Sequence, residues 1–244
     1  VSKHVLFDYI HLTKPRLMWL LCLVAFAGMA VSAKSSLSFN TIVLTLLGGI
    51  LAIGASGTFN HIFEADLDKN MSRTANRPLA TQKISKSNAW IFGVALATAS
   101  TLIFLTLNLF AALLALSAIL YYSVIYTLLL KPNTAQNTVI GGVAGSFPVI
   151  IGSVAATATI TTDAILLAIL IFFWTPAHFY NLALTYKKDF EQSGLPMFPV
   201  VHGDAKTRKH ILFYFGATLI SALLFFFVSG LSLLFFSVNS IFFI

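Results

Sequence analysis

The sequence predicts an all-α membrane protein, a polytopic helical bundle with seven full spans and a partial eighth. Hydrophobic residues make up 58% of the 244-residue chain and charged residues only 9%, whereas soluble domains carry about a quarter of their residues as charged side chains. The charges are also clustered, which leaves uncharged runs that reach or approach the ~20 residues needed to cross ~30 Å of hydrocarbon. The single cysteine, Cys22, lies in the first run and excludes an intramolecular disulfide framework.

The uncharged runs divide into spans in chain order. The run from Ser87 to Leu130 is long enough for two crossings, with Asn108 as the polar turn between them. The last run supplies one crossing that ends near Gly230, and too few residues follow for another. We therefore expect spans at residues 16–34, 39–63, 87–107, 109–130, 138–157, 163–186 and 210–230, with a partial eighth after them.

The fifth span is rich in small residues. Gly141 and Gly145 are four positions apart, and Pro148 follows them. Small residues let helices approach closely in lipid, so close helix packing is one interpretation of this pattern. A wall that faces a substrate is the other.

Membrane topology explains the formal net charge of +7 more simply than binding to nucleic acid does. If the N-terminus is cytoplasmic, every Lys and Arg except Lys34 falls on the cytoplasmic side, as the positive-inside rule requires. The loops at 64–86 and 187–209 lie on that side and are long and charged, so we expect the function there. The lipid bilayer is the expected environment, and no nucleic-acid partner is expected.

An acidic stripe begins at the end of the second span. At about 100° per residue, Asn60, Glu64 and Asp68 project from one helix face within about 80°. Mg²⁺ commonly takes one or two carboxylates and fills its other positions with water and substrate phosphate. Acids at a membrane-embedded helix end are costly and usually functional or paired. We therefore expect these side chains to bind Mg²⁺ beside a substrate phosphate, an arrangement that an enzyme of prenyl diphosphates needs.

Two arginines follow the stripe. Arg73 and Arg77 carry guanidinium groups, which form forked hydrogen bonds to phosphate oxygens. With the metal ion they would neutralise departing diphosphate, so they join the stripe in the expected catalytic set. The competing interpretation is that they only neutralise the acids or contact lipid headgroups. Asp66 lies about 200° from Glu64 on a helix, and we expect it to orient Arg73.

The stretch from Asn60 to Pro78 resembles the first signature of the UbiA prenyltransferase superfamily. The likeness is greatest to the heme branch, the protoheme IX farnesyltransferases or heme O synthases, and extends over about residues 8–215. Supporting motifs are Thr13-Lys14-Pro15-Arg16, Tyr126 with Lys131, the glycine-rich run 137–148, Trp174-Thr175-Pro176-Ala177-His178-Phe179 and the string from Lys188 to Gly203.

The resemblance implies a Mg²⁺-dependent enzyme of heme O and heme A biosynthesis for terminal oxidases. It would transfer a farnesyl group from farnesyl diphosphate to a vinyl group of heme b, with addition of water, to give heme O and diphosphate. The implied location is the plasma membrane of a prokaryote, or the mitochondrial inner membrane of a eukaryote. A heme A synthase or a terminal oxidase assembly is a candidate partner. Because the family has nine spans, we expect residues 1–244 to form a single domain that lacks the C-terminal helices.

Further site residues follow from the resemblance. UbiA enzymes usually carry a second Asp-x-x-x-Asp motif, but here Asp189 is followed four positions later by Ser193. Asp189 is therefore expected either to share the one metal ion or to hold lysines and arginines in place. His178 is the candidate contact for heme iron, with a hydrogen-bonded structural role as the alternative.

Basic residues complete the expected substrate site. Lys14, Arg16 and Lys131 are candidates to meet the heme propionates, and anchoring in lipid headgroups is the alternative. The resemblance adds Tyr126 and Lys188 to the substrate-binding set.

Three other functions stay open. A UbiA enzyme that prenylates a quinone precursor or another lipid acceptor would be favoured by an intact second Asp-x-x-x-Asp motif. A transporter or channel that binds a cation would place its ionisable residues at mid-membrane. A heme-binding membrane protein without catalysis would show a heme spectrum and no release of diphosphate.

Overall fold

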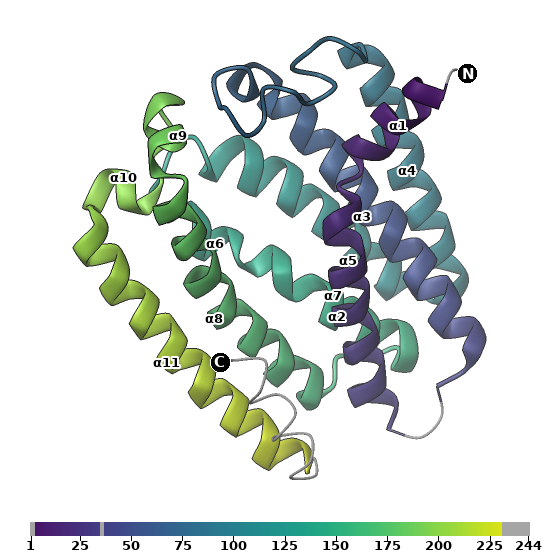
Figure 1. Ribbon diagram of the computed structural model, residues 1–244. Helices are drawn as coiled ribbons and strands as arrows, with labels where there is room; N and C mark the ends of the chain where they lie inside the picture. Colours follow the sequence, from purple (N-terminus) through teal and green to yellow (C-terminus); the bar gives the residue numbers. More distant parts are fainter. Residues whose placement is uncertain (1–2, 35–36, 231–244) are drawn as a thin grey trace.

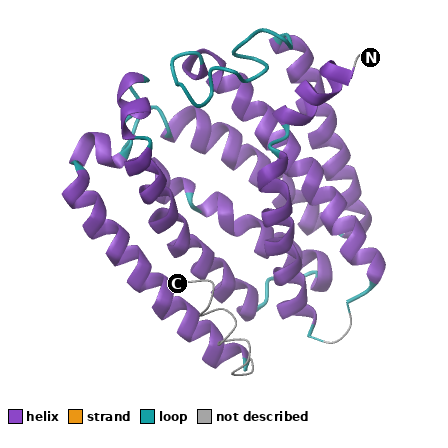
Figure 2. Cartoon of the chain, viewed as in Figure 1, coloured by secondary structure: helices purple, strands orange, loops and turns teal. Residues whose placement is uncertain are grey.

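The computed structural model describes residues 3–34 and 37–230, which form helices and no strand (Figure 2). In chain order the elements are α1 (Lys3–Leu12), α2 (Pro15–Ala33), α3 (Phe39–Asp68), α4 (Lys86–Leu107), α5 (Leu109–Leu120), the π-helix η1 (Tyr121–Leu130), α6 (Asn137–Gly141), α7 (Val143–Thr157), α8 (Thr162–Thr185), α9 (Lys187–Gln192), α10 (Phe198–His202) and α11 (Asp204–Ser229).

Seven stretches within the described residues are long and apolar enough to cross a membrane, which confirms the predicted integral membrane bundle. They are α2, α3, α4, α5 with η1, α6 with α7, α8, and α11. The expected partial eighth span falls at 231–244, outside the described residues.

Polar side chains cap the helices where the sequence turns. Asn108 ends α4 and accepts a hydrogen bond from the Ala111 backbone N–H at 2.8 Å, so it caps α5 as the predicted polar turn. Its side-chain amide also donates to the Val154 carbonyl at 2.9 Å, which ties the turn to α7. Such caps satisfy backbone donors that a helix start leaves unpaired.

Glycines allow α2 and α7 to pack backbone to backbone. A Cβ on Gly152 would lie 2.1 Å from the Ala25 carbonyl oxygen, and a Cβ on Gly28 would lie 2.2 Å from the Val149 carbonyl oxygen. No side chain larger than hydrogen fits at either position without movement of the helices. The close approach is the kind that small residues permit between membrane helices.

The two small residues singled out in the fifth span also serve packing. A Cβ on Gly141 would lie 2.2 Å from the ring of Tyr126, and one on Gly145 would lie 3.3 Å from the Thr175 hydroxyl. The packing interpretation therefore holds for both glycines. Pro148, by contrast, lines an internal cavity described below.

The fourth span differs from the uniform helix expected over 109–130. Its second half, η1, is π-helical, and the Lys131 backbone N–H bonds to the Tyr126 carbonyl five positions back at 2.9 Å. Such segments occur frequently at functional sites. η1 carries Tyr122, Tyr126 and Thr127.

Both charged loops lie at one end of the bundle, here called the polar end. Figure 1 shows α1, the loop 69–85, α9 and α10 together there, as expected for loops on one side of the bilayer. The expected loop 187–209 contains two short helices, and α11 begins at Asp204, before the predicted start of the last span.

Candidate functional site

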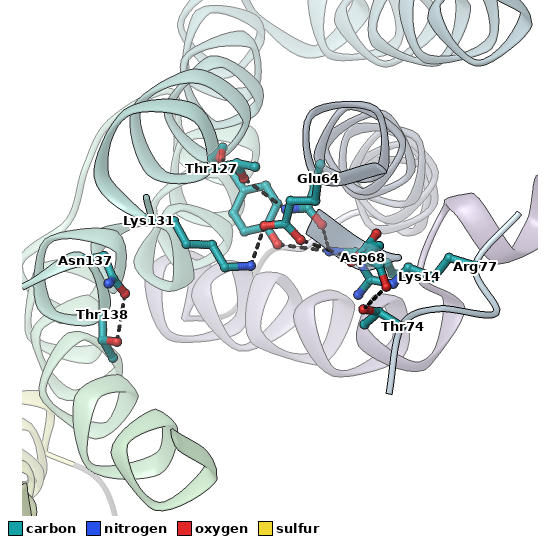
Figure 3. A network of polar contacts seen from close by, with 11 residues as sticks. Lys14, Glu64, Asp68, Thr74, Arg77, Thr127, Lys131, Asn137 and Thr138 are labelled. Atoms are coloured by element: carbon teal, nitrogen blue, oxygen red, sulfur yellow. Dashed lines mark hydrogen bonds and ion pairs between the residues drawn. The ribbon is translucent and has the colours of Figure 1, made fainter. Parts of the chain in front are cut away.

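The predicted acidic stripe is buried at the polar end of α3. The exposed fractions are 2% for Asn60, 5% for Glu64 and 2% for Asp68. The three side chains share one face of the helix; Arg77 links Glu64 to Asp68 (Figure 3), and Asn60 contacts Lys14.

Each member of the stripe contacts a cationic side chain. Arg77 Nη1 donates to both carboxylate oxygens of Asp68 at 2.8 Å and lies 3.5 Å from Glu64 Oε2. Lys131 Nζ donates to Glu64 Oε1, and Lys14 Nζ donates to Asn60 Oδ1. These side chains, with Asn60, are here called the polar cluster, and in it three basic groups face two carboxylates. The excess of one positive charge suits the cluster to an anion that binds together with a metal ion.

Lys14 reaches this cluster from the connection between α1 and α2. Its backbone is left-handed, with φ 54° and ψ 58°, and Pro15 starts α2 directly after it. Gly57 of α3 makes room, because a Cβ there would lie 2.9 Å from the Leu12 carbonyl oxygen and 3.3 Å from Lys14 Cγ. Burial lowers the pKa of Lys14 to about 7, although Glu64 opposes this effect.

The π-helix η1 supplies polar partners that the sequence did not reveal. The Asn60 side-chain amide donates to Thr127 Oγ1 at 3.1 Å, and Thr127 Oγ1 donates to the Tyr122 carbonyl at 2.9 Å. The Tyr122 hydroxyl accepts from Lys14 Nζ at 3.2 Å, and the rings of Tyr122 and Tyr126 lie 5.4 Å apart. No periodic signal distinguishes η1 from an α-helix, so these contacts were not predictable.

Thr74 and the pair Asn137–Thr138 are further polar groups near the stripe; they lie within motifs of the family resemblance but were not among the expected site residues. Thr74 Oγ1 donates to the Asp68 carbonyl at 3.2 Å. Thr138 Oγ1 donates to Asn137 Oδ1 at 3.1 Å, and Figure 3 shows this buried pair beyond Lys131 on the side away from Asp68. The pair begins α6, so η1 and α6 flank Lys131 in the chain.

The expectation that Asp66 orients Arg73 is wrong. Asp66 Oδ1 lies 2.8 Å from Lys69 Nζ and Asp66 Oδ2 lies 3.0 Å from Lys86 Nζ. Both lysines are nearer because α3 continues to Asp68 and presents Asp66 on its exposed side, beside the start of α4. The Arg73 guanidinium instead lies over the Tyr186 ring at 5.4 Å from the centroid.

Asp189 joins the two charged loops. Both of its carboxylate oxygens accept from Ser72 Oγ at 2.9 Å, so its partner is a hydroxyl rather than a lysine or arginine. No group of three or more His, Cys, Asp or Glu side chains suited to a metal occurs in the parts of the chain that the structure describes. The structure therefore does not bring Asp189 to Glu64 and Asp68, and its role as a ligand stays a prediction.

Three other expected residues lie on exposed surface outside the network. His178 is exposed on α8, and its ring stacks on Trp174 at 4.7 Å with an interplanar angle of 12°. Arg16 is exposed at the start of α2, and Lys188 is exposed on α9. The expected heme contacts of His178 and Arg16, and the expected substrate-binding role of Lys188, stay predictions.

An apolar cavity of ≈ 130 Å³ adjoins the polar cluster. Lys14, Tyr122 and Gly57 line its polar end, and side chains of α2, α5 and α7 line its walls. The residues of α3 that line it recur every three or four positions: Thr45, Leu46, Gly49, Ala52, Ile53, Ser56 and Gly57. This periodicity continues into Asn60, Glu64 and Asp68, so one face of α3 serves both the cavity and the polar cluster.

Residues 21–244 match the family model described as the UbiA prenyltransferase family. The chain belongs to the UbiA prenyltransferase family. Among curated UbiA relatives it is 58% identical over 214 residues to the protoheme IX farnesyltransferase of Haloarcula marismortui, which covers 88% of this chain and 46% of the relative. It is 44% identical over 216 residues to the protoheme IX farnesyltransferase of Mycobacterium avium, with 88% and 70% covered. The chain thus spans about half the length of the haloarchaeal relatives.

Solved UbiA structures share the fold. A UbiA homolog from Archaeoglobus fulgidus bound to GPP and Mg²⁺ matches with a TM-score of 0.75 at 20% identity, over 91% of this chain and 78% of that one. The apo structure of a UbiA homolog from Aeropyrum pernix matches with a TM-score of 0.79 at 19% identity, over 89% and 81%. Together with the family match, these likenesses confirm the predicted UbiA-type membrane bundle.

Proposed function

We propose that this chain carries the donor site of a protoheme IX farnesyltransferase, or heme O synthase, of heme O and heme A biosynthesis. The observation that carries the proposal is the single face of α3, where a buried polar cluster ends and an apolar cavity begins. A prenyl diphosphate has the same two parts, an anionic head and an apolar tail. The acceptor, heme b, is inferred from the curated relatives named protoheme IX farnesyltransferase.

The donor set of the stripe fits Mg²⁺. Asn60, Glu64 and Asp68 offer only oxygen atoms toward the site, and hard cations prefer oxygen ligands. We infer that these three residues hold the ion. Bound there, Mg²⁺ would neutralise charge on the diphosphate oxygens.

The basic groups of the cluster are placed to act on the leaving diphosphate. With Mg²⁺ held by Glu64 and Asp68, Lys131 and Arg77 would no longer pair with these carboxylates and would be free to donate to diphosphate oxygens. Lys14, at the boundary between cluster and cavity, would reach the oxygen next to the first carbon of the chain. Preorganised donors of this kind stabilise the charge that develops in the transition state.

The proposed chemistry breaks the bond between the first farnesyl carbon and its oxygen, and the bonding electrons leave with diphosphate. The vinyl group of heme b then attacks that carbon, water adds to the carbon left electron-deficient, and one proton is released. The apolar cavity keeps water from the allylic cation until the vinyl group attacks. The rings of Tyr122 and Tyr126 lie at the cluster, where their faces would stabilise the cation.

The proposal includes an orientation and a heme contact. By the positive-inside rule, the polar end faces the cytoplasm of a prokaryotic cell membrane, or the matrix if the source is eukaryotic. His178 is the proposed contact for heme iron, and Arg16 is a proposed partner of its propionates. Lys188 is retained as a proposed substrate-binding residue, and a heme A synthase or terminal oxidase assembly is the proposed recipient of the product.

The mass of the heme product tests the proposal. Protein purified in lipid nanodiscs is given heme b, farnesyl diphosphate and Mg²⁺, and the extracted heme is analysed by mass spectrometry. We expect a heme heavier by one farnesyl group and one hydroxyl group, because the added water releases one proton. Prenylation of a quinone precursor in the same assay, with heme b unchanged, would reject the heme assignment.

A further inference from the structure

The apolar cavity has a closed end far from the polar cluster. Along α3 it extends from Gly57 to Thr45, a distance of about 18 Å for twelve helical positions. Thr45 is 0% exposed and Phe104 is 1% exposed, and both line the cavity. At its polar end, by contrast, the cavity meets Lys14 and Tyr122.

Phe104 of α4 forms this end and is held firmly. Its ring lies against Gly48 of α3, where an added Cβ would be 2.8 Å from Cε2 of the ring. Behind it, Phe104 packs in a hydrophobic cluster that includes Ala111, Ala112 and Val154. The end of the cavity is therefore backed by close-packed core rather than by an opening, and close-packed cores resist changes of volume.

We propose that Phe104, seated on Gly48, sets the maximum length of the prenyl chain that the cavity accepts. The inference rests on the proposed function, because it assigns the cavity to the tail of a prenyl diphosphate. A chain with one isoprene unit too many must displace the Phe104 ring or bend back toward the cluster. A chain with one unit too few leaves apolar surface at the closed end without contact.

Substitutions at two positions move the closed end in opposite directions. Phe104→Ala removes the ring and lengthens the cavity, and Phe104→Leu does so less, with less risk to folding. Gly48→Ala adds a Cβ that pushes the ring toward the cavity and shortens it. Val154→Ala is the matched control, because Val154 is 0% exposed in the same hydrophobic cluster but does not line the cavity.

Binding of unreactive thiolodiphosphate analogues with ten, fifteen and twenty carbons tests the inference without any acceptor. Dissociation constants are measured by calorimetry in nanodiscs with Mg²⁺. For Phe104→Ala and Phe104→Leu we expect the affinity ratio of the twenty- to the fifteen-carbon analogue to rise, by about tenfold in the Ala variant. For Gly48→Ala we expect the ratio of the ten- to the fifteen-carbon analogue to rise, and for Val154→Ala neither ratio to change.

The outcomes separate this inference from the proposed function. If the unmodified protein binds the analogues but both ratios stay the same in the Phe104 and Gly48 variants, the assignment of Phe104 is wrong and the proposed function stands. If the unmodified protein binds no analogue, the proposed function fails, and the inference fails with it.

Discussion

Asp68 and Asp66 are two positions apart on α3, but their surroundings differ. Asp68 is buried and receives a forked hydrogen bond from Arg77, whereas Asp66 is exposed and pairs with Lys69 and Lys86. Surface pairs of the second kind contribute little to stability. The contrast supplies a carboxylate to test and a neighbouring carboxylate as its control.

Replacing Asp68 by Asn should lower kcat/KM for farnesyl transfer by about 10²–10³-fold, the usual effect of removing one preorganised electrostatic group. The amide keeps the shape of the side chain but loses the charge that holds the metal ion and Arg77. Asp66→Asn should retain nearly full activity, and both variants should insert into membranes in equal amounts. Normal turnover of Asp68→Asn would remove the metal site from the proposed mechanism.

Lys14 predicts a dependence of binding on pH. Its pKa of about 7 means that the free protein carries a charged Lys14 below pH 7 and a mostly neutral one above it. Because diphosphate favours the charged form, affinity for a prenyl thiolodiphosphate should fall as the pH rises from 7 to 9, by up to about tenfold per pH unit.

Calorimetry across that pH range measures the effect, with Lys14→Arg as the control, since guanidinium stays protonated throughout. A slope that is the same in Lys14→Arg and in the unmodified protein would assign the titration to another group.

The residue scale also shows what the sequence can predict about the site. The stripe was predictable because a helix places positions 60, 64 and 68 on one face whatever surrounds it. Its partners Lys14 and Lys131 come from segments 46 and 67 positions away, and no local pattern encodes such distances. The partner of Asp66 was misassigned for a different reason, because the prediction passed over Lys69, three positions on along the same helix.

At the scale of elements, the spans were predictable because length and polarity decide which segments cross a bilayer. The π-helical half of the fourth span was not, because its apolar sequence is compatible with either helix type. The short helices α9 and α10 were not expected either, since charged loops and short interfacial helices have similar composition. Close contacts between helices depend on single glycines, so a substitution at one glycine tests one contact.

Gly152→Ala should destabilise the bundle. Its new Cβ would lie 2.1 Å from the Ala25 carbonyl oxygen, and backbone atoms can yield only if α2 and α7 separate. Overpacking of this kind typically costs about 1–3 kcal/mol, so the thermal midpoint in nanodiscs should fall.

Gly216→Ala is the matched control, because a Cβ at Gly216 of α11 meets nothing within 4 Å. Alanine favours a helix over glycine, so this variant should match or exceed the stability of the unmodified protein. An equal loss in both variants would show that the contact between α2 and α7 is not limiting.

At the scale of the whole molecule, two loops far apart in the chain meet over one end of the bundle. Ser72 donates to Asp189, and Arg73 lies over Tyr186, so the loop 69–85 is connected to the segment around α9. The polar cluster below this contact holds three cations against two carboxylates. Metal and diphosphate together complete that balance of charge, whereas either one alone leaves an excess of one sign.

Ligand and metal should therefore stabilise the protein jointly. A ligand that binds only the folded state at one hundred times its Kd adds about 2.7 kcal/mol to the free energy of unfolding. We expect the thermal midpoint to rise markedly with farnesyl thiolodiphosphate plus Mg²⁺, and only slightly with either component alone or after addition of EDTA. Asp68→Asn should lose most of the joint effect, while Asp66→Asn should keep it, since only Asp68 belongs to the stripe. Equal stabilisation by the analogue with and without EDTA would mean that the basic residues alone bind diphosphate, and that α3 does not use its carboxylates to hold a metal ion.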